Sequence, residues 1–142
     1  MLAPLGLQAI VQPAFEYRAL DVRASDPAGY ARLEAARPGD LVVFTSPRAV
    51  EHGLAQIPRA LLRRLRVAAI GPASGAALAA AGIPVVISAG EGYTSEALLA
   101  ALNTTRALEP PGQAFVVAAP GGREALLDGL LGLGWQAVML MV

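Results

Sequence analysis

Short apolar runs alternate with longer alanine- and leucine-rich segments along most of this chain. The runs are four to six residues long and rich in valine or isoleucine: LVVF from Leu41, VAAI from Val67, PVVI from Pro84, AFVVAA from Ala114 and AVMLMV from Ala137. A strand that is buried on both faces of a parallel sheet has this unbroken apolar pattern. The runs therefore predict five parallel strands, beginning near Leu41, Val67, Val85, Phe115 and Ala137.

The segments between these runs have the periodicity of helices. Residues 48–56, 74–81, 95–102 and 122–133 carry apolar residues at three- and four-residue spacings. Gly82 and Gly134 stand where the carboxyl-terminal caps of two of these helices would fall. Strand and helix in repeated alternation predict right-handed crossovers and helices on both faces of the sheet. The expected fold class is a three-layer α/β/α domain of flavodoxin-like type with a five-stranded parallel sheet.

Composition narrows the possible functions. The chain has 142 residues, 55% of them apolar, which suits about one packed domain. The 11 acidic residues balance the 11 basic ones, so no broad nucleic-acid-binding field is expected. Cysteine is absent, which excludes disulfides and thiolate metal sites. No signal peptide and no run of membrane-spanning length is recognisable, so we expect a cytoplasmic protein without a membrane partner.

The first forty residues depart from the strand–helix rhythm. LQAIVQPAFEY could add one more strand, whereas RASDPAGYARLEAARPGD holds two prolines and a short helical stretch at 30–36. We expect this part to be a connection, with residues before about Arg37 poorly packed on the main unit. Both ends of the chain resemble interrupted elements. Strand edges left exposed in this way would favour self-association.

Polar turn residues follow each of the first four predicted strands. Ligands of open parallel sheets bind at the carboxyl ends of the strands, where each strand turns into a helix. Backbone N–H groups at helix starts, hydroxyls and close-approach glycines suit phosphates or carboxylates there. The candidate binding residues are Thr45, Ser46, Gly71, Ser74, Thr94, Ser95, Gly121, Gly122 and Arg123.

Each of these features also has a purely structural interpretation. Ser46 and Ser95 can be helix caps, GPAS can be a proline-started helix, and PGGR can be a tight turn. His52 has no second ligand at metal spacing, Tyr93 can shield an apolar patch, and Trp135 can pack before the last strand. No catalytic triad, paired carboxylate, metal cluster, G-x-G-x-x-G sequence or phosphate loop is recognisable, so no cofactor and no metal are expected.

The order of the motifs is more informative than any one of them. DLVVFTSPRAVEHGL, LRVAAIGPASGAALAAAGIPVV, TSEALLAAL and VVAAPGGREALLDGLLGLGWQAVML follow one another over about a hundred residues. This succession resembles the uroporphyrinogen-III synthase family, in which a D-x-[VI]-[VI]-F-T-S-x-x-[AG]-V segment precedes [AV]-[IV]-G-x-x-T-A-x-A-L-x-x-x-G. Ser74 stands where the family usually has threonine. LGLQAIVQPAFEY resembles the family's first helix end and second strand.

The resemblance implies a two-domain enzyme whose chain begins in one domain, completes the second and returns to the first. Residues 1–37 would be a remnant of the first domain and a linker, and residues 38–142 the second domain. The family closes hydroxymethylbilane to uroporphyrinogen III, with inversion of ring D and loss of water and without a cofactor or metal. Its substrate, a linear tetrapyrrole, lies between the domains.

The resemblance leaves the catalytic residue unknown. The family's tyrosine follows the last strand of the second domain, beyond Val142. We therefore expect an incomplete, inactive chain. The alternatives are a non-enzymatic flavodoxin-like module that binds small anions and a paralogue that kept the fold and lost the activity.

Overall fold

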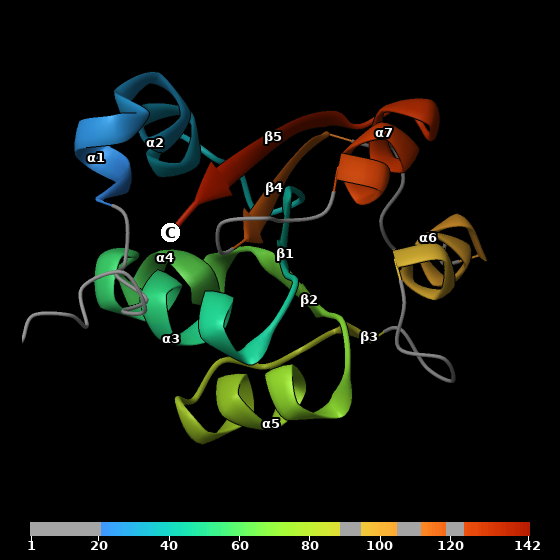
Figure 1. Ribbon diagram of the computed structural model, residues 1–142, viewed down its shortest axis with the longest axis horizontal. Helices are drawn as coiled ribbons and strands as arrows, with labels where there is room; N and C mark the ends of the chain where they lie inside the picture. Colours follow the sequence, from blue (N-terminus) through green and yellow to red (C-terminus); the bar gives the residue numbers. More distant parts are fainter. Residues whose placement is uncertain (1–20, 89–94, 105–111, 119–123) are drawn as a thin grey trace, which may run out of the picture.

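The computed structural model describes residues 21–88, 95–104, 112–118 and 124–142 (Figure 1). The helices are α1 (Val22–Ser25), α2 (Pro27–Glu34), α3 (Pro47–Gln56), α4 (Arg59–Arg64), α5 (Pro72–Ala80), α6 (Ser95–Thr104) and α7 (Glu124–Gly132). The strands are β1 (Leu41–Phe44), β2 (Arg66–Ala69), β3 (Ile87–Ser88), β4 (Gln113–Ala118) and β5 (Gln136–Met141). No helix among these described residues is both long and apolar enough to cross a membrane.

The strands form one parallel sheet in the order β3-β2-β1-β4-β5. The expectation of an α/β chain with a parallel sheet and helices is confirmed. The expectation of five parallel strands holds only in part, because β3 begins at Ile87 and has two residues, which pair with Ala68 and Ala69. The predicted run PVVI begins at Pro84, which has no N–H to donate to a neighbouring strand, and β3 lies at the edge of the sheet. Four strands of four to six residues therefore form the body of the sheet.

The flavodoxin-like label is wrong in its strand order. A flavodoxin-like sheet has the order 2-1-3-4-5, whereas the order 3-2-1-4-5 is that of the dinucleotide-binding doubly wound fold. Here the chain moves outward from β1 through β2 to β3 and then crosses to the other side of β1 to form β4. All of the predicted runs are apolar on both faces, so their sequences carried no information about which strands are neighbours.

Apolar clusters lie on both faces of the sheet, and alternate residues of each strand enter opposite clusters. In β1, Val42 and Phe44 join the cluster beneath α3 and α5, while Leu41 and Val43 join the cluster beneath α6 and α7. In Figure 1, α6 and α7 accordingly lie together on one side of the sheet. The prediction of helices on both faces is confirmed, and so are the glycines after the helices, since Gly82 and Gly134 have φ of 79° and 96°.

The expectation that residues before Arg37 pack poorly is wrong for the described part. Val22, Tyr30 and Leu33 are 1%, 3% and 0% exposed and belong to the cluster that contains Phe44. The phenol of Tyr30 donates a 2.9 Å hydrogen bond to the carbonyl oxygen of Gln56, and the N–H of Val22 donates to Oε1 of the same residue at 2.8 Å. The segment that forms α1 and α2 is short and contains a proline, but its apolar residues share one face of these helices. This face packs against β5.

Candidate functional site

The carboxyl ends of the central strands meet at one edge of the sheet. Phe44, the last residue of β1, pairs with Ala69 of β2 and Val117 of β4. The turns that follow these strands therefore begin side by side. β1 is followed by α3 on one face of the sheet, and its neighbour β4 is followed by α7 on the opposite face. The strand order therefore reverses direction between β1 and β4 at this edge. Such a reversal leaves a crevice in which the ligands of open α/β sheets bind.

The hydroxyls that follow β1 make hydrogen bonds within the protein. Ser46 is the N-cap of α3, and its Oγ accepts a 3.1 Å hydrogen bond from the N–H of Ala49. Thr45 is 4% exposed, and its Oγ1 donates to the carbonyl oxygen of Val117 at 3.3 Å. The cap interpretation of Ser46 is therefore confirmed. Each hydroxyl still has capacity left, since the Ser46 O–H can donate and the Thr45 oxygen can accept.

The turn that follows β2 has a different character. Gly71 precedes α5 with φ of 90°, a conformation that side-chain-bearing residues rarely adopt, and a Cβ there would meet no atom within 4 Å. No side chain caps this helix, which starts at Pro72 as its proline-started interpretation predicts. Ser74 is 1% exposed, and its Oγ has no hydrogen-bond partner in the described structure. A helix start without a side-chain cap thus lies beside a buried hydroxyl that has no partner among the described residues.

Several of the predicted site residues cannot be placed. Thr94, Gly121, Gly122 and Arg123 lie outside the described residues. Ser95 is the first residue of α6, and its side chain also lies outside the described part. The structure therefore brings Thr45, Ser46, Gly71 and Ser74 to one edge, and the contribution of the other turns stays a prediction.

Comparison with known proteins agrees with this architecture. The profile of the family described as uroporphyrinogen-III synthase HemD matches residues 2–142. This chain belongs to that family. A comparison with curated proteins gave no match.

Solved structures of the family share the fold. The native wild-type uroporphyrinogen III synthase of Thermus thermophilus is 25% identical over 81% of this chain and 45% of its own, with a TM-score of 0.57. Another structure of the Thermus thermophilus synthase is 24% identical over 89% of this chain and 48% of its own, with a TM-score of 0.63. This member of the family thus spans about half the length of the solved synthases that it matches.

One residue at this edge was missed by sequence reasoning. Arg48 lies in the first turn of α3, two residues after Ser46, and is half-buried. The sequence did offer a signal for Arg48, namely its position shortly after Thr45 and Ser46. A basic side chain in the first turn of that helix lies near any anion bound at the edge of the sheet. His52 is half-buried one turn further along, and Trp135 is 5% exposed within the core, which confirms its packing role. Among the described residues no group of acidic, histidine or cysteine side chains could hold a metal.

Proposed function

We propose that this chain is part of a uroporphyrinogen-III synthase, which closes hydroxymethylbilane to uroporphyrinogen III with inversion of ring D and loss of water. The observation that carries the proposal is the family match over residues 2–142 together with the open start of α5 beside the buried hydroxyl of Ser74. The enzyme would be a cytoplasmic hydro-lyase that acts without a cofactor or metal. A catalytic acid is not assigned.

The chemistry of the substrate suits this edge of the sheet. Hydroxymethylbilane carries carboxylates on all of its rings, and the start of a helix attracts anions through its free N–H groups and its dipole. Gly71 has no Cβ, so a carboxylate can approach the backbone closely there. The Ser74 hydroxyl would donate to the same carboxylate, which removes the cost of burying it without a partner. A protein of zero net charge can bind a polyanion in this way.

The substrate would contact several turns at once. We assign to it the turns that contain Thr45, Ser46, Gly71, Ser74, Thr94, Ser95, Gly121, Gly122 and Arg123. Residues 38–142 would form the second domain of the synthase and residues 1–37 a remnant of the first domain with a linker. Because the chain spans 45% of the native Thermus structure, the opposite wall of the cleft would come from outside this sequence. Holding the two ends of the tetrapyrrole together would supply much of the rate acceleration.

A module that binds small anions without enzymatic activity is the second candidate. The same open start of α5 supports it, because one helix start and one hydroxyl are sufficient for a single carboxylate. The two functions differ in the ligand that each prefers. A synthase domain requires the tetrapyrrole, whereas an anion module would bind succinate or acetate as tightly as it binds the tetrapyrrole.

Amide NMR shifts of the labelled chain would test the proposal. Uroporphyrinogen III, added under reducing conditions, should shift the amides of Ser46, Gly71 and Ser74 at concentrations where succinate shifts none of them. Equal responses to succinate would favour the anion module, and shifts confined to the opposite edge of the sheet would contradict both functions. Hydroxymethylbilane incubated with the chain alone should close only to the type I isomer. Type III product above the protein-free control would contradict the need for a second wall of the cleft.

A further inference from the structure

Basic charge is concentrated at the edge of the sheet opposite the candidate site. Between His52 and Gly90 the sequence has four arginines and no acidic residue, although the whole chain has zero net charge. Three of these arginines belong to α4, whose buried residues are Leu61 and Leu62. Its exposed residues are Arg59, Ala60, Arg63 and Arg64. The solvent face of this helix is therefore almost entirely cationic.

These charges do little to hold the fold together. Nε of Arg63 donates a 3.3 Å hydrogen bond to the carbonyl oxygen of Gly82. The side chains of Arg59 and Arg64 form no hydrogen bond or ion pair with any residue in the described part of the chain. By contrast, Nε of Arg32 on α2 donates to Oε1 of Gln113 at 3.1 Å. As far as the described residues go, the guanidinium groups of Arg59 and Arg64 are therefore available to a partner.

Helix energetics explain two of the arginines but not the third. Arg63 and Arg64 lie in the last turn of α4, where positive charge interacts favourably with the helix dipole. Arg59 is the first residue of the same helix, where positive charge is unfavourable. It also lies four residues before Arg63, a spacing at which like charges repel. The local stability of α4 therefore gives no reason for an arginine at position 59.

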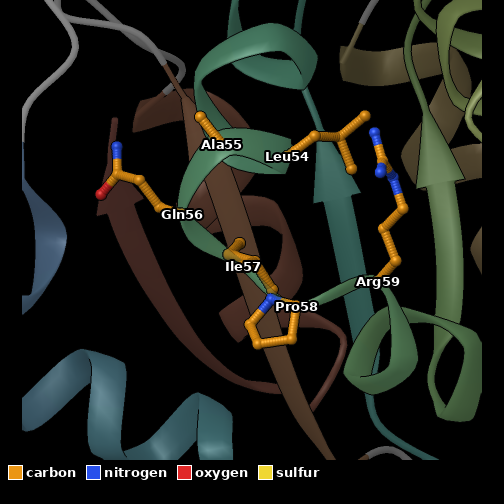
Figure 2. A pocket seen from close by; sticks show the side chains of 6 residues that line it. All are labelled: Leu54, Ala55, Gln56, Ile57, Pro58 and Arg59. Carbon is orange, nitrogen blue, oxygen red and sulfur yellow. The ribbon is translucent and has the colours of Figure 1, made fainter.

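Arg59 lines a groove at the junction of α3 and α4. The groove has a volume of about 400 Å³ and is lined by Leu54, Ala55, Gln56, Ile57, Pro58 and Arg59. Figure 2 shows the side chain of Arg59 extending toward Leu54, so that its guanidinium lies near the branched end of the leucine. Aliphatic surface and a cation thus occur side by side at an open groove, an arrangement typical of protein interfaces, in which arginine often carries much of the binding energy.

We infer that this groove and the arginine face of α4 form a docking surface for an acidic, extended peptide segment of another protein. Carboxylates of the segment would pair with Arg59 and Arg64, since a guanidinium binds a carboxylate through two parallel hydrogen bonds. One apolar side chain of the segment would enter the groove between Leu54 and Pro58. The apolar groove favours a peptide over a nucleic acid, whose phosphates need only the charges. A bound segment would leave the carboxyl edge of the sheet open, so the inference does not depend on the proposed function.

Fluorescence anisotropy with a labelled synthetic peptide tests this inference. The peptide consists of aspartate and glutamate around one central leucine, and a second peptide has serine in place of the leucine. Arg59→Glu and Arg64→Glu should each weaken binding of the leucine peptide by about tenfold or more, while the charge-matched control Arg32→Glu should change it by less than about twofold. Arg59→Glu should also raise the midpoint of urea unfolding, because it places a negative charge at a helix start.

The groove itself requires a separate variant. Ala55 is exposed and lines the groove, so Ala55→Leu should fill it without removing a charge. This change should weaken the leucine peptide and leave the serine peptide unaffected. Absence of peptide binding would overturn the inference, and so would an equal loss in Arg32→Glu. Polyuridylate that binds more tightly than the peptide, with the same arginine dependence and no effect of Ala55→Leu, would instead indicate a general polyanion surface and would also overturn it.

Discussion

The side chain of Asp40 joins the amino ends of two neighbouring strands: its Oδ1 accepts a 3.0 Å hydrogen bond from the backbone N–H of Gln113. Its Oδ2 accepts another, at 2.9 Å, from the N–H of Arg37. Asp40 precedes β1 and is 6% exposed, so this carboxylate fixes the start of β1 against that of β4 from within the structure. At the opposite end of the same two strands lies the carboxyl edge that carries Thr45 and Ser46 of the candidate site.

Replacement of Asp40 should destabilise the fold. Asp40→Asn keeps the size of the side chain but turns one acceptor into a donor that faces an N–H, so we expect a loss of about 1.5–3 kcal/mol in the free energy of unfolding. Urea denaturation followed by circular dichroism measures this loss. Asp21→Asn is the control, because Asp21 is exposed and its side chain accepts a long hydrogen bond, of 3.4 Å, from the N–H of Ala24. Equal effects of the two changes would contradict the role of Asp40.

Two helical glycines should respond oppositely to alanine. A Cβ on Gly53 of α3 would lie 2.9 Å from Cε1 of Phe44 and 3.2 Å from Cγ1 of Val117, so Gly53→Ala should overpack the core and destabilise the fold by about 1–3 kcal/mol. A Cβ on Gly75 of α5 would meet no atom within 4 Å, and Gly75→Ala should stabilise the fold by about 0.5–1 kcal/mol through helix propensity. Thermal unfolding of both variants tests the pair. A stabilised Gly53→Ala protein would show that α3 packs less closely on the sheet than described.

Removal of the Ser74 hydroxyl should not weaken the fold of the free chain. The hydroxyl is buried and has no partner in the part of the chain that the structure describes, so Ser74→Ala should leave the free energy of unfolding unchanged or raise it by up to about 1 kcal/mol. The same variant should bind uroporphyrinogen III less tightly. Thr45→Val is the matched comparison, since it removes only the hydrogen bond to Val117 and should cost about 0.5–1.5 kcal/mol. A loss above about 1 kcal/mol in Ser74→Ala would assign that hydroxyl to the fold and not to a ligand.

The phenol of Tyr30 should hold α1 and α2 in place. Its O–H donates to Gln56, and its oxygen accepts a 3.2 Å hydrogen bond from Arg23, so Tyr30→Phe should cost about 0.5–1.5 kcal/mol. The hydrogen bond to Tyr30 raises the pKa of Arg23 above its ordinary value. The stability linked to that raised pKa would be lost only as the pH rises through it, so the contact should not vary between about pH 5 and 9. Hydrogen exchange should accelerate in residues 22–34 of the variant and be unchanged in β4.

The outer edge of β5 is suited to self-association. This six-residue strand lies at the edge of the sheet and contains neither a charge nor a proline, the usual protection against pairing with another chain. Light scattering should show a mass that rises with protein concentration. Met139→Lys, which places a charge on the half-buried part of this strand, should reduce the rise. A mass equal to one chain at every concentration would contradict the prediction.

The sequence by itself determined where most of the strands and helices lie, although it did not predict α1 and α4. Each strand is a run that is apolar on both faces, and each helix has apolar spacing of its own, so LVVF, AFVVAA and SEALLAAL predict their elements without any neighbour. The position of Thr45 and Ser46 at the carboxyl edge also followed, because parallel strands always end at the same side of a sheet. The ends of helices at Gly82 and Gly134 are also local features, because the positive φ that ends each helix is a property of one residue.

Only the tertiary structure decided how these elements meet. The order of strands depends on pairing energies between runs that are almost equally apolar, so the sequence could not place β4 beside β1. The docking of Tyr30 on Gln56 and the missing partner of Ser74 depend on residues far away in the chain. The groove beside Arg59 arises where two helices join. Local patterns select elements, whereas burial, hydrogen-bond satisfaction and charge pairing are properties of side chains from distant segments and exist only once the chain has packed.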